Sequence, residues 1–417
     1  MRILLFALVL FCSLASLAQN EETVSNLLNR VLPSFKFKQE LKNCVLMPGG
    51  EFVSGRRNGA DSITLGYPVK TKIQPFLISK FEVRNKDYRS FTVYVRDSIL
   101  HTLLGHFITT GKPGRIDWAI KIDFKDPKVE PMILSPEERI MGRKEMDVTK
   151  IIYRTSSGQN IAIYPDTLVW IRDFAYSYNE PMTKRYFSHP SFNNYPVVGV
   201  SQVQALAYCD WLTQQWNADL QTLGEKNYHF LVKLPSSEEW EYAAQTTYSV
   251  SIKDSTQRLS CESQYGSTTT PDNGYKYNIG RYFDATGLEV KSYGNDGYFY
   301  TAPASSYKAD KNGLYNMIGN VAEWTSTPGG YKPVYNAGRN EELVSLFKKF
   351  PNSPFIKMSE KEIDSYLKKY IITKGGAWHT DGDFYLQPGV NQYFSANDFA
   401  TCYIGFRMAI SIVRNGN

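Results

Sequence analysis

The chain has few residues that can hold a metal ion through sulfur or imidazole. Its 417 residues include only 5 cysteines and 5 histidines. No two cysteines stand at C-x-x-C spacing, which excludes a zinc ribbon and a thioredoxin-type redox motif. The closest histidines, His101 and His106, have no acidic partner at ligand spacing. The sequence therefore predicts that the histidines are ordinary polar residues.

Blocks of like charge and membrane-length apolar runs are also absent. Lys and Arg number 47 against 41 Asp and Glu, and they are spread along the chain, which argues against nucleic-acid binding. Residues 3–11 form an apolar run that is too short to span a bilayer. With Arg2 before this run and Ala18 after it, residues 1–18 are predicted to be a signal peptide for export.

Export leaves two questions about cysteine open. Cys12 lies inside the signal, so a lipid anchor is an alternative, although Phe11 stands where lipid attachment normally needs a small residue. An oxidising compartment would allow the other four cysteines three disulfide connectivities, and buried free thiols are the alternative. These cysteines are Cys44, Cys209, Cys261 and Cys402.

Aromatic residues make up 14% of the chain and hydrophobic residues 42%. This composition favours a β-rich, loop-rich architecture over a helical bundle, with a sizeable core. We predict a linker with one short helix over residues 19–40 and one domain over residues 41–413. Within that domain, residues 98–190 and 337–370 break the regular pattern and are predicted to be insertions.

The first insertion carries an aromatic, turn-flanked segment over residues 164–181. Exposed Trp, Tyr and Arg side chains are typical anchors of protein interfaces. We therefore predict that this insertion lies on the surface and faces a partner. The alternative is burial in the insertion's own core, because the candidates alternate along a predicted strand. The candidate partner-binding residues are Trp170, Arg172, Phe174, Tyr176 and Tyr178.

Two helix starts are visible in the sequence. Asn85 is predicted to cap a helix whose apolar face carries Tyr88, Phe91 and Val95. The sequence L-P-S-S-E-E-W-E-Y-A-A over residues 234–244 places Ser236 three residues before Glu239. This spacing predicts a capping box at the start of a second helix.

Residues 313–325 combine turn glycines, asparagines and one acidic residue beside a Trp. Such a loop offers backbone carbonyls, amide oxygens and one carboxylate, which are ligands that a hard cation prefers.

These motifs together resemble the formylglycine-generating enzyme domain, also called the sulfatase-modifying factor domain. The resemblance implies an irregular α+β fold of C-type-lectin kind. The segments that carry it, in order, are residues 48–52, 81–88, 196–201, 207–211, 234–244, 319–324, 375–378 and 405–407.

Active members of that family oxidise a sulfatase cysteine with a copper-binding cysteine pair. At the corresponding places this chain has Thr380 and Tyr385. A hydroxyl or a phenol cannot replace the thiolate that binds Cu(I), so we predict that the chain is not an enzyme and holds no copper. Gln202 is a further difference, since the family usually has Trp there.

The resemblance also implies two structural calcium sites. In each site, backbone carbonyls and side-chain oxygens would hold the ion. The first set is Asn316, Gly319, Val321 and Glu323. The second set is Asn278, Ile279, Asp296 and Tyr298.

The first insertion carries a second resemblance, to a narrower family of proteins. Its segment 164–181, followed by residues 186–199, resembles the GldK/PorK family of the type IX secretion and gliding machinery. This implies a non-catalytic component that forms a periplasmic ring with a GldN/PorN-like partner at the outer membrane. The alternatives are a calcium-dependent carbohydrate-binding module and a formylglycine-generating oxidase.

Overall fold

A computed structural model provides the fold. It describes residues 26–29, 34–55, 69–109, 114–173, 179–247, 277–280, 282–283, 289–290, 296–329, 361–362, 365, 369–380, 386, 388–395 and 400–415. The predicted signal peptide and most of the second insertion lie outside these residues. Within the described part, no helix is both long enough and apolar enough to cross a membrane.

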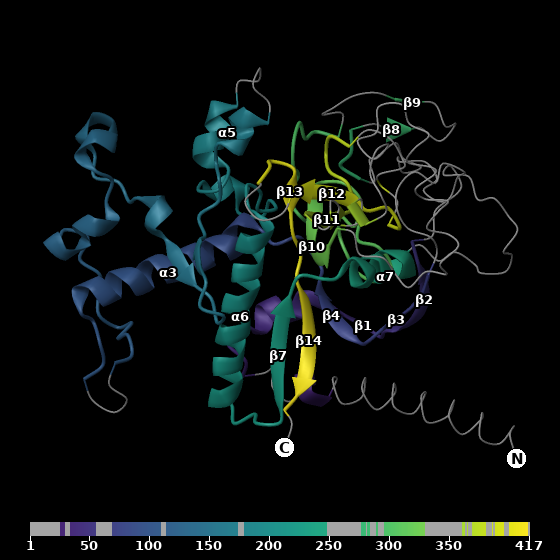
Figure 1. The fold of residues 1–417 in the computed structure, drawn as a ribbon, viewed down its shortest axis with the longest axis horizontal. Helices are drawn as coiled ribbons and strands as arrows, with labels where there is room; N and C mark the ends of the chain where they lie inside the picture. Colours follow the sequence, from purple (N-terminus) through teal and green to yellow (C-terminus); the bar gives the residue numbers. More distant parts are fainter. Residues whose placement is uncertain are drawn as a thin grey trace, which may run out of the picture.

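One four-stranded sheet joins strands from both ends of the domain. Its order is β1-β4-β14-β7, and neighbouring strands are antiparallel. The last strand of the chain therefore lies between β4 and β7 (Figure 1). Its strands are β1 (Cys44–Met47), β4 (Phe76–Ser79), β14 (Ala409–Arg414) and β7 (Tyr228–Lys233).

A second sheet has the order β12-β11-β10-β13, in which β13 runs parallel to β10. Its strands are β12 (Gln392–Ser395), β11 (Tyr370–Lys374), β10 (Ala322–Pro328) and β13 (Ile404–Gly405). The described residues also form three two-stranded sheets. They pair β2 (Gly50–Ser54) with β3 (Val69–Ile73), β5 (Ile152–Arg154) with β6 (Asn160–Ala162), and β8 (Tyr282–Phe283) with β9 (Glu289–Val290).

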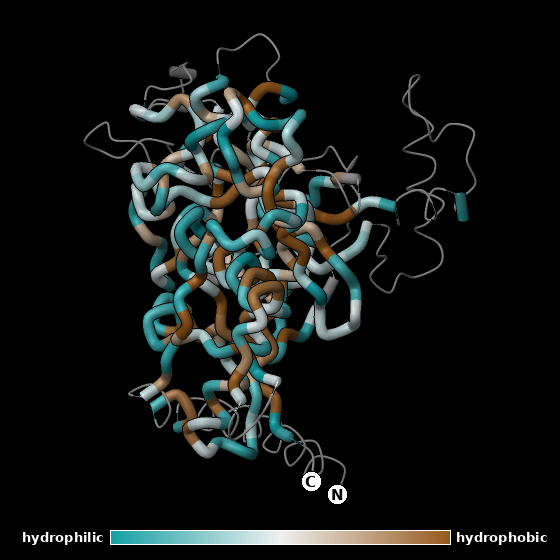
Figure 2. Tube along the Cα trace, turned by 90° about the vertical axis from the view of Figure 1, so that its left-hand side faces the viewer, coloured by the Kyte–Doolittle hydropathy of each residue, from teal (hydrophilic) through white to brown (hydrophobic). Residues whose placement is uncertain are grey.

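Two long helices supply much of the aromatic core. Helix α3 (Asn85–Leu104) buries Tyr88, Phe91 and Val95, as its periodicity predicts. Helix α6 (Gln202–Thr222) packs beside β7, and the Tyr208 ring of α6 stacks on Tyr88 at 5.5 Å. Hydrophobic segments accordingly occupy the interior in Figure 2, and hydrophilic ones lie mostly outside. The mixed α+β architecture is confirmed.

Helix α7 (Ser237–Thr247) begins with the predicted capping box. The Glu239 N–H donates to Ser236 Oγ at 3.1 Å, and the Ser236 N–H donates to Glu239 Oε2 at 2.9 Å. Helix α7 is tied to β11 by Glu241, whose carboxylate lies 3.6 Å from Lys374 Nζ in the interior.

The start of α3 differs from the sequence prediction. Arg84, and not Asn85, is the N-cap residue. The Arg84 N–H donates to Asp87 Oδ2 at 3.3 Å, which leaves the Asn85 amide free to donate elsewhere. Asn85 is fully buried and donates to the carbonyls of Tyr186 and Phe192. It therefore holds the first insertion against the helix.

The first insertion contains more packed structure than predicted. Its first seven residues, 98–104, belong to α3, and the rest contains the β5–β6 hairpin and short helices. Several of its apolar side chains, such as Val129, Met132 and Ile163, lie in the main core. The short helices are η1 (Pro127–Met132), η2 (Pro136–Glu138), η3 (Ile140–Gly142), η4 (Val148–Lys150), α4 (Val169–Arg172), α5 (Glu180–Arg185) and η5 (Pro190–Phe192).

The segment predicted as a linker also differs from expectation. Phe35 is 1% exposed and packs edge-on against Trp216 of α6 at 5.8 Å. Leu27 belongs to the same core, and α2 (Lys38–Lys42) follows. Leu27 and Phe35 are therefore part of the domain, because their apolar side chains cover its core.

Candidate functional site

The loop before β10 brings together residues that are distant in the sequence. Asn316 and Asn320 both have positive φ, at 51° and 61°. Gly319 has φ 75°, and a Cβ at this position would collide with the Asn278 carbonyl oxygen. The loop can follow this path because Gly tolerates both the backbone angle and the close approach.

Glu323 lies fully buried at the start of β10, in a hydrogen-bonded ion pair with Arg407. Arg407 Nε donates to Glu323 Oε2 at 2.6 Å, and Arg407 Nη2 donates to Oε1 at 2.7 Å. Trp240 Nε1 also donates to Oε2 at 2.6 Å. Burial by itself lowers the pKa of Arg407, and nearby carboxylates, Glu323 first, raise it above its usual value. Arg407 therefore stays charged and joins β10 to the chain just before β14.

A second buried carboxylate lies beside this pair. Glu82 is 1% exposed and accepts hydrogen bonds from the Asn320 amide at 2.9 Å and the Asn316 amide at 3.1 Å. Burial raises the pKa of Glu82 to about 7; Arg407 lowers it and Glu323 raises it. The polar side chains of this loop thus bind a buried carboxylate of the same fold.

The first predicted calcium set fits this network better than it fits a metal site. The amide of Asn316 donates to Glu82, and Glu323 already accepts three hydrogen bonds from Arg407 and Trp240. A cation on Glu323 would lie close to a guanidinium that uses both oxygens of the same carboxylate. Gly319 and Val321 lie in the same loop, and Val321 is completely buried.

The arrangement of the second predicted calcium set is more favourable for a metal ion than that of the first set. Asn278 Nδ2 donates to the Tyr300 carbonyl at 2.8 Å, which places residues 277–280 beside residues 296–300. Asp296 Oδ1 accepts from the Tyr298 N–H at 3.0 Å, and Oδ2 accepts from the Tyr307 hydroxyl. Asp296 makes no ion pair within the described residues, so its charge is available to a cation. Ile279 is buried beside Ile318 and Leu386.

No cluster of three or more His, Cys, Asp and Glu side chains suited to a metal ion occurs in the part of the chain that the structure describes. Any calcium at Asp296 would therefore depend on carbonyl and amide oxygens for its other ligands.

A turn lies at Thr380, the position that the resemblance matches to the first copper-binding cysteine of active family members. Thr380 Oγ1 accepts from the Ala377 N–H at 2.7 Å, and the Thr380 carbonyl accepts from the Gly280 N–H at 3.2 Å. Tyr385 lies outside the described residues. The residues present do not fit Cu(I), because a Thr hydroxyl is not a thiolate.

The described cysteines cannot substitute for the missing pair. Cys44, Cys209 and Cys402 are free thiols on separate elements. Burial raises the pKa of Cys44 to about 12, and it raises the pKa of Cys209 and Cys402 even further. Such thiols stay protonated and unreactive.

Gln202 has a structural role in this fold. It is 6% exposed, and its Nε2 donates to the Thr325 carbonyl at 2.8 Å. The side chain thus fixes the first turn of α6 to β10.

The predicted partner-binding set is only partly on the surface. Trp170 is 2% exposed and packs against Tyr186 at 4.8 Å and Tyr300 at 5.5 Å, so it is a core residue and not an exposed anchor. It lies on the short helix α4 and not on a strand. Arg172 is about half exposed and pairs with Asp166 at 2.8 Å. The other three candidates, Phe174, Tyr176 and Tyr178, lie outside the described residues.

The sequence analysis missed the apolar residues that the insertion does expose. Within the described residues, ten of the fourteen large exposed hydrophobic side chains lie in residues 98–190. No periodicity separates them from the core residues around them, and two of them, Ile140 and Met141, are adjacent in the chain. They are Leu103, Phe107, Trp118, Ile120, Phe124, Ile140, Met141, Ile152, Leu168 and Ile171.

Comparison with known proteins shows the family to which this chain belongs. Residues 31–412 match the sulfatase-modifying factor enzyme 1-like domain, and the chain belongs to this family. The match includes the Glu323–Arg407 pair, the Thr380 turn and both insertions.

Its relatives include active and inactive proteins. The chain is 26% identical over 308 residues to the formylglycine-generating enzyme of Thermomonospora curvata, covering 70% of this chain and 76% of the relative. It is 24% identical over 293 residues to the inactive C-alpha-formylglycine-generating enzyme 2 of Mus musculus, covering 69% of each chain. Among solved structures, it is similar to PvdO from Pseudomonas aeruginosa, with 15% identity, a TM-score of 0.40, and coverage of 88% of this chain and 93% of that one.

Proposed function

We propose that this chain is a non-catalytic member of the family, and that it serves as a structural component of the type IX secretion and gliding machinery. In this proposal it is exported, acts in the periplasm at the outer membrane, and forms a ring with a GldN/PorN-like partner. The observation that carries the loss of catalysis is the pair Thr380 and Tyr385 at the places of the copper-binding cysteines. The existence of inactive relatives in the same family is consistent with it.

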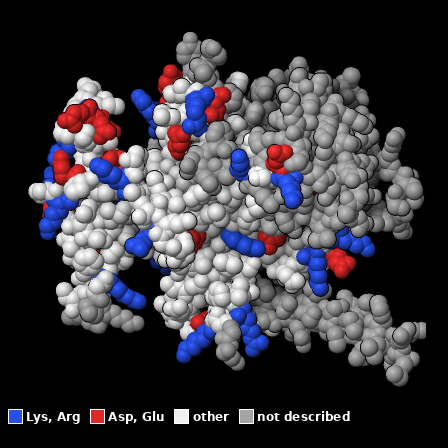
Figure 3. All heavy atoms as spheres, viewed as in Figure 1, with Lys and Arg blue, Asp and Glu red and all other residues white. Residues whose placement is uncertain are grey.

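The assembly role is supported by the surface of the first insertion. A large apolar side chain contributes favourable free energy to binding when a partner removes it from water. Clusters of such exposed side chains therefore often mark protein interfaces. The insertion concentrates such side chains, among them Phe124 at 53% and Leu168 at 61% exposure. Acidic and basic side chains also gather on the left-hand end of the molecule in Figure 3. A mixed charged rim around apolar contacts is the usual composition of a protein interface.

The test is co-purification with a GldN/PorN-like protein from the same organism. We expect Phe124→Asp and Leu168→Asp to weaken that complex. Phe299→Asp, which changes an even more exposed residue outside the insertion, should leave it intact. If all three variants retain the partner equally, the insertion is not the contact surface. If the wild-type chain retains no such partner, the secretion role is wrong.

The oxidase alternative has its own test. The purified chain, loaded with Cu(I) and given a sulfatase peptide, is expected to produce no formylglycine, as measured by the mass of the peptide. A mass shift that depends on copper would overturn the non-catalytic assignment.

For the second oxygen-ligand set we propose a structural calcium ion held by Asn278, Ile279, Asp296 and Tyr298. The observation that favours it is the carboxylate of Asp296, which accepts two hydrogen bonds but makes no ion pair within the described residues. A chelator should then lower the melting temperature of the wild type and should leave that of Asp296→Asn unchanged. An equal response of both proteins to the chelator would exclude this site. The carbohydrate-binding alternative predicts that glycan binding disappears with the same chelator.

A further inference from the structure

One exposed loop of the first insertion carries two apolar side chains at its end. Ile140 is 71% exposed and Met141 is 88% exposed. Met141 has φ 52° and ψ 32°, a left-handed conformation that is rare for a bulky residue. Residues 139–144 are called the tip below. Strain of this kind in an exposed loop is a reason to look for a function.

The tip is held rigid at its base. The Leu134 N–H donates to the Glu145 carbonyl at 2.9 Å, which closes the loop. Glu130 binds Arg139 at 2.7 Å and Lys144 at 2.9 Å from below. A loop that is already ordered loses little entropy when its end is buried by a partner. The tip is therefore prepared for insertion into a complementary surface.

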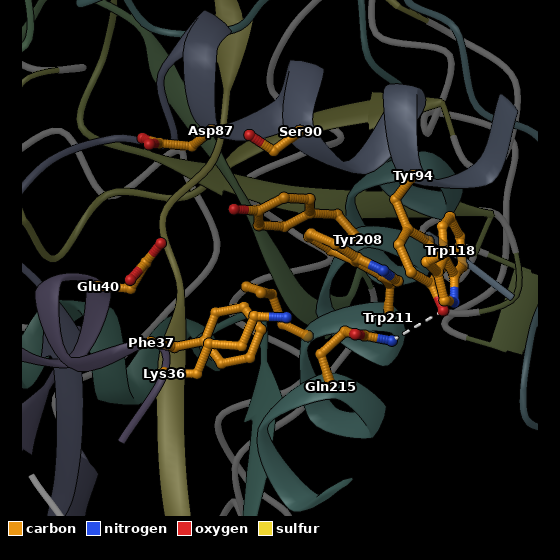
Figure 4. A pocket seen from close by; sticks show the side chains of 11 residues that line it. Lys36, Phe37, Glu40, Asp87, Ser90, Tyr94, Trp118, Tyr208, Trp211 and Gln215 are labelled. Atoms are coloured by element: carbon orange, nitrogen blue, oxygen red, sulfur yellow. Dashed lines mark hydrogen bonds between the residues drawn. The ribbon is translucent and has the colours of Figure 1, made fainter. Parts of the chain in front are cut away.

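A complementary surface exists on the same chain. A cavity of about 550 Å³ opens between the segment around α2, helix α3 and helix α6 (Figure 4). It is called the aromatic cleft below. Its main aromatic walls are Phe37, Tyr94, Trp118 and Trp211. Tyr94 stacks on Trp118 at 5.0 Å, and Trp118 remains 48% exposed.

The charges beside the two surfaces are also complementary. Two acidic residues, Glu40 and Asp87, and one basic residue, Lys36, line the aromatic cleft, and Arg143 belongs to the tip. Glu40 and Arg143 are exposed, and neither makes an ion pair within the described residues. Methionine packs favourably against aromatic rings, so Met141 is chemically suited to the cleft. The exposure of Ile140 and Met141 means that the tip does not occupy the cleft of its own chain.

We propose that the tip of one copy inserts into the aromatic cleft of a second copy. This inference rests on the proposed assembly function and names the contact between neighbouring copies. Tip and cleft are different surfaces, so the contact is heterologous. Repeating a heterologous contact closes a ring or extends a filament, and a symmetric dimer does not result. Met141 against Trp118 and Trp211 is the central apolar contact, and Arg143 to Glu40 fixes its direction.

Two exposed substitutions test the contact separately. Met141→Asp places a charge at the tip, and Ser90→Arg places a large cation on the α3 side of the cleft. Both positions are exposed, so folding, checked by circular dichroism, should be unchanged. Phe299→Asp is the matched control, because Phe299 is 72% exposed and belongs to neither surface.

Sedimentation velocity over a concentration series measures the association. We expect the wild type and Phe299→Asp to self-associate, and each of the other variants to weaken association by at least about tenfold. An equimolar mixture of Met141→Asp and Ser90→Arg should form dimers and nothing larger. In this mixture, one variant contributes an intact cleft and the other an intact tip, and both remaining surfaces are blocked.

Three results would overturn the proposal. They are a wild type that remains monomeric at high concentration, variants that associate like the wild type, and a folded mixture that forms no dimers. If Ser90→Arg loses only the GldN/PorN-like protein, then that partner and not a second copy occupies the cleft. Retention of that partner by the wild type is measured independently, so failure of the tip contact and failure of the secretion role are distinguishable.

Discussion

Removing the Glu323 carboxylate should destabilise the domain strongly, because it leaves Arg407 charged and uncompensated in the interior. The side chains of both residues are at most 1% exposed, with an N–O distance of 2.6 Å. Breaking a buried pair by deleting one partner costs about 3–5 kcal/mol. Glu323→Ala also removes the acceptor of Trp240 Nε1. We therefore expect the free energy of unfolding to fall to this extent.

Urea unfolding followed by tryptophan fluorescence measures the loss. Glu323→Gln keeps an oxygen acceptor and should lose less than Glu323→Ala. The double variant with Arg407→Met should lose about 0.5–3 kcal/mol less than the sum of its two single variants, because the two side chains interact directly. Glu130→Ala, which breaks only exposed ion pairs, should change stability far less.

The result also separates a structural carboxylate from a calcium ligand. If Glu323 acts through Arg407, its loss costs the same stability with calcium and with a chelator. A loss below about 1 kcal/mol, against the range expected for a broken buried pair, would refute the argument. So would additive single variants, or a loss that appears only when calcium is present.

Three further outcomes follow from buried residues. Because burial raises the pKa of Glu82 from 4.5 to about 7, the folded state holds a proton that the unfolded state releases between these pH values. Stability from this group is therefore complete below pH 4.5 and is lost as pH rises toward 7. The free energy of unfolding of Glu82→Gln minus that of the wild type should rise by about 3 kcal/mol over this window and then level off; a flat difference would contradict the shift. Trp170→Ala should lower the free energy of unfolding, measured with urea, by about 3–5 kcal/mol. A loss near zero would show that Trp170 is not a core residue. Gly319→Ala should lower the melting temperature more than Gly313→Ala, since both have positive φ but only Gly319 meets a carbonyl, that of Asn278; equal effects would show that the backbone angle alone matters.

Local signals in the sequence predicted the elements whose cause is local. The Ser236–Glu239 capping box and the apolar face of α3 follow from spacing along one helix, and both are confirmed. The prediction that Asn85 caps α3 is wrong, because Arg84 has the extended backbone conformation of the N-cap residue and Asn85 is already the first residue of the helix. Residues 196–201 are buried but form only an isolated bridge at Pro196. Their partners come from distant loops, for example the Thr401 carbonyl, which accepts from the Gly199 N–H.

The exposure of side chains in the insertion could not be predicted from residue types. Trp170 and Met141 both lie in a segment with little periodicity, yet one is buried and the other almost fully exposed. The difference depends on whether a core surface lies over the residue, and that surface comes from other parts of the chain. The same reason explains why Phe35 belongs to the core and not to a linker.

The sequence by itself determined the family and predicted the loss of the copper-binding cysteines, because residue identity at Thr380 and Tyr385 needs no coordinates. Only the tertiary structure decided how Glu323 is used, since its partners Arg407 and Trp240 lie 84 and 83 residues away along the chain. A carboxylate such as that of Glu323 can bind either a metal cation or a guanidinium. Which of the two it meets is fixed by the packing of distant strands.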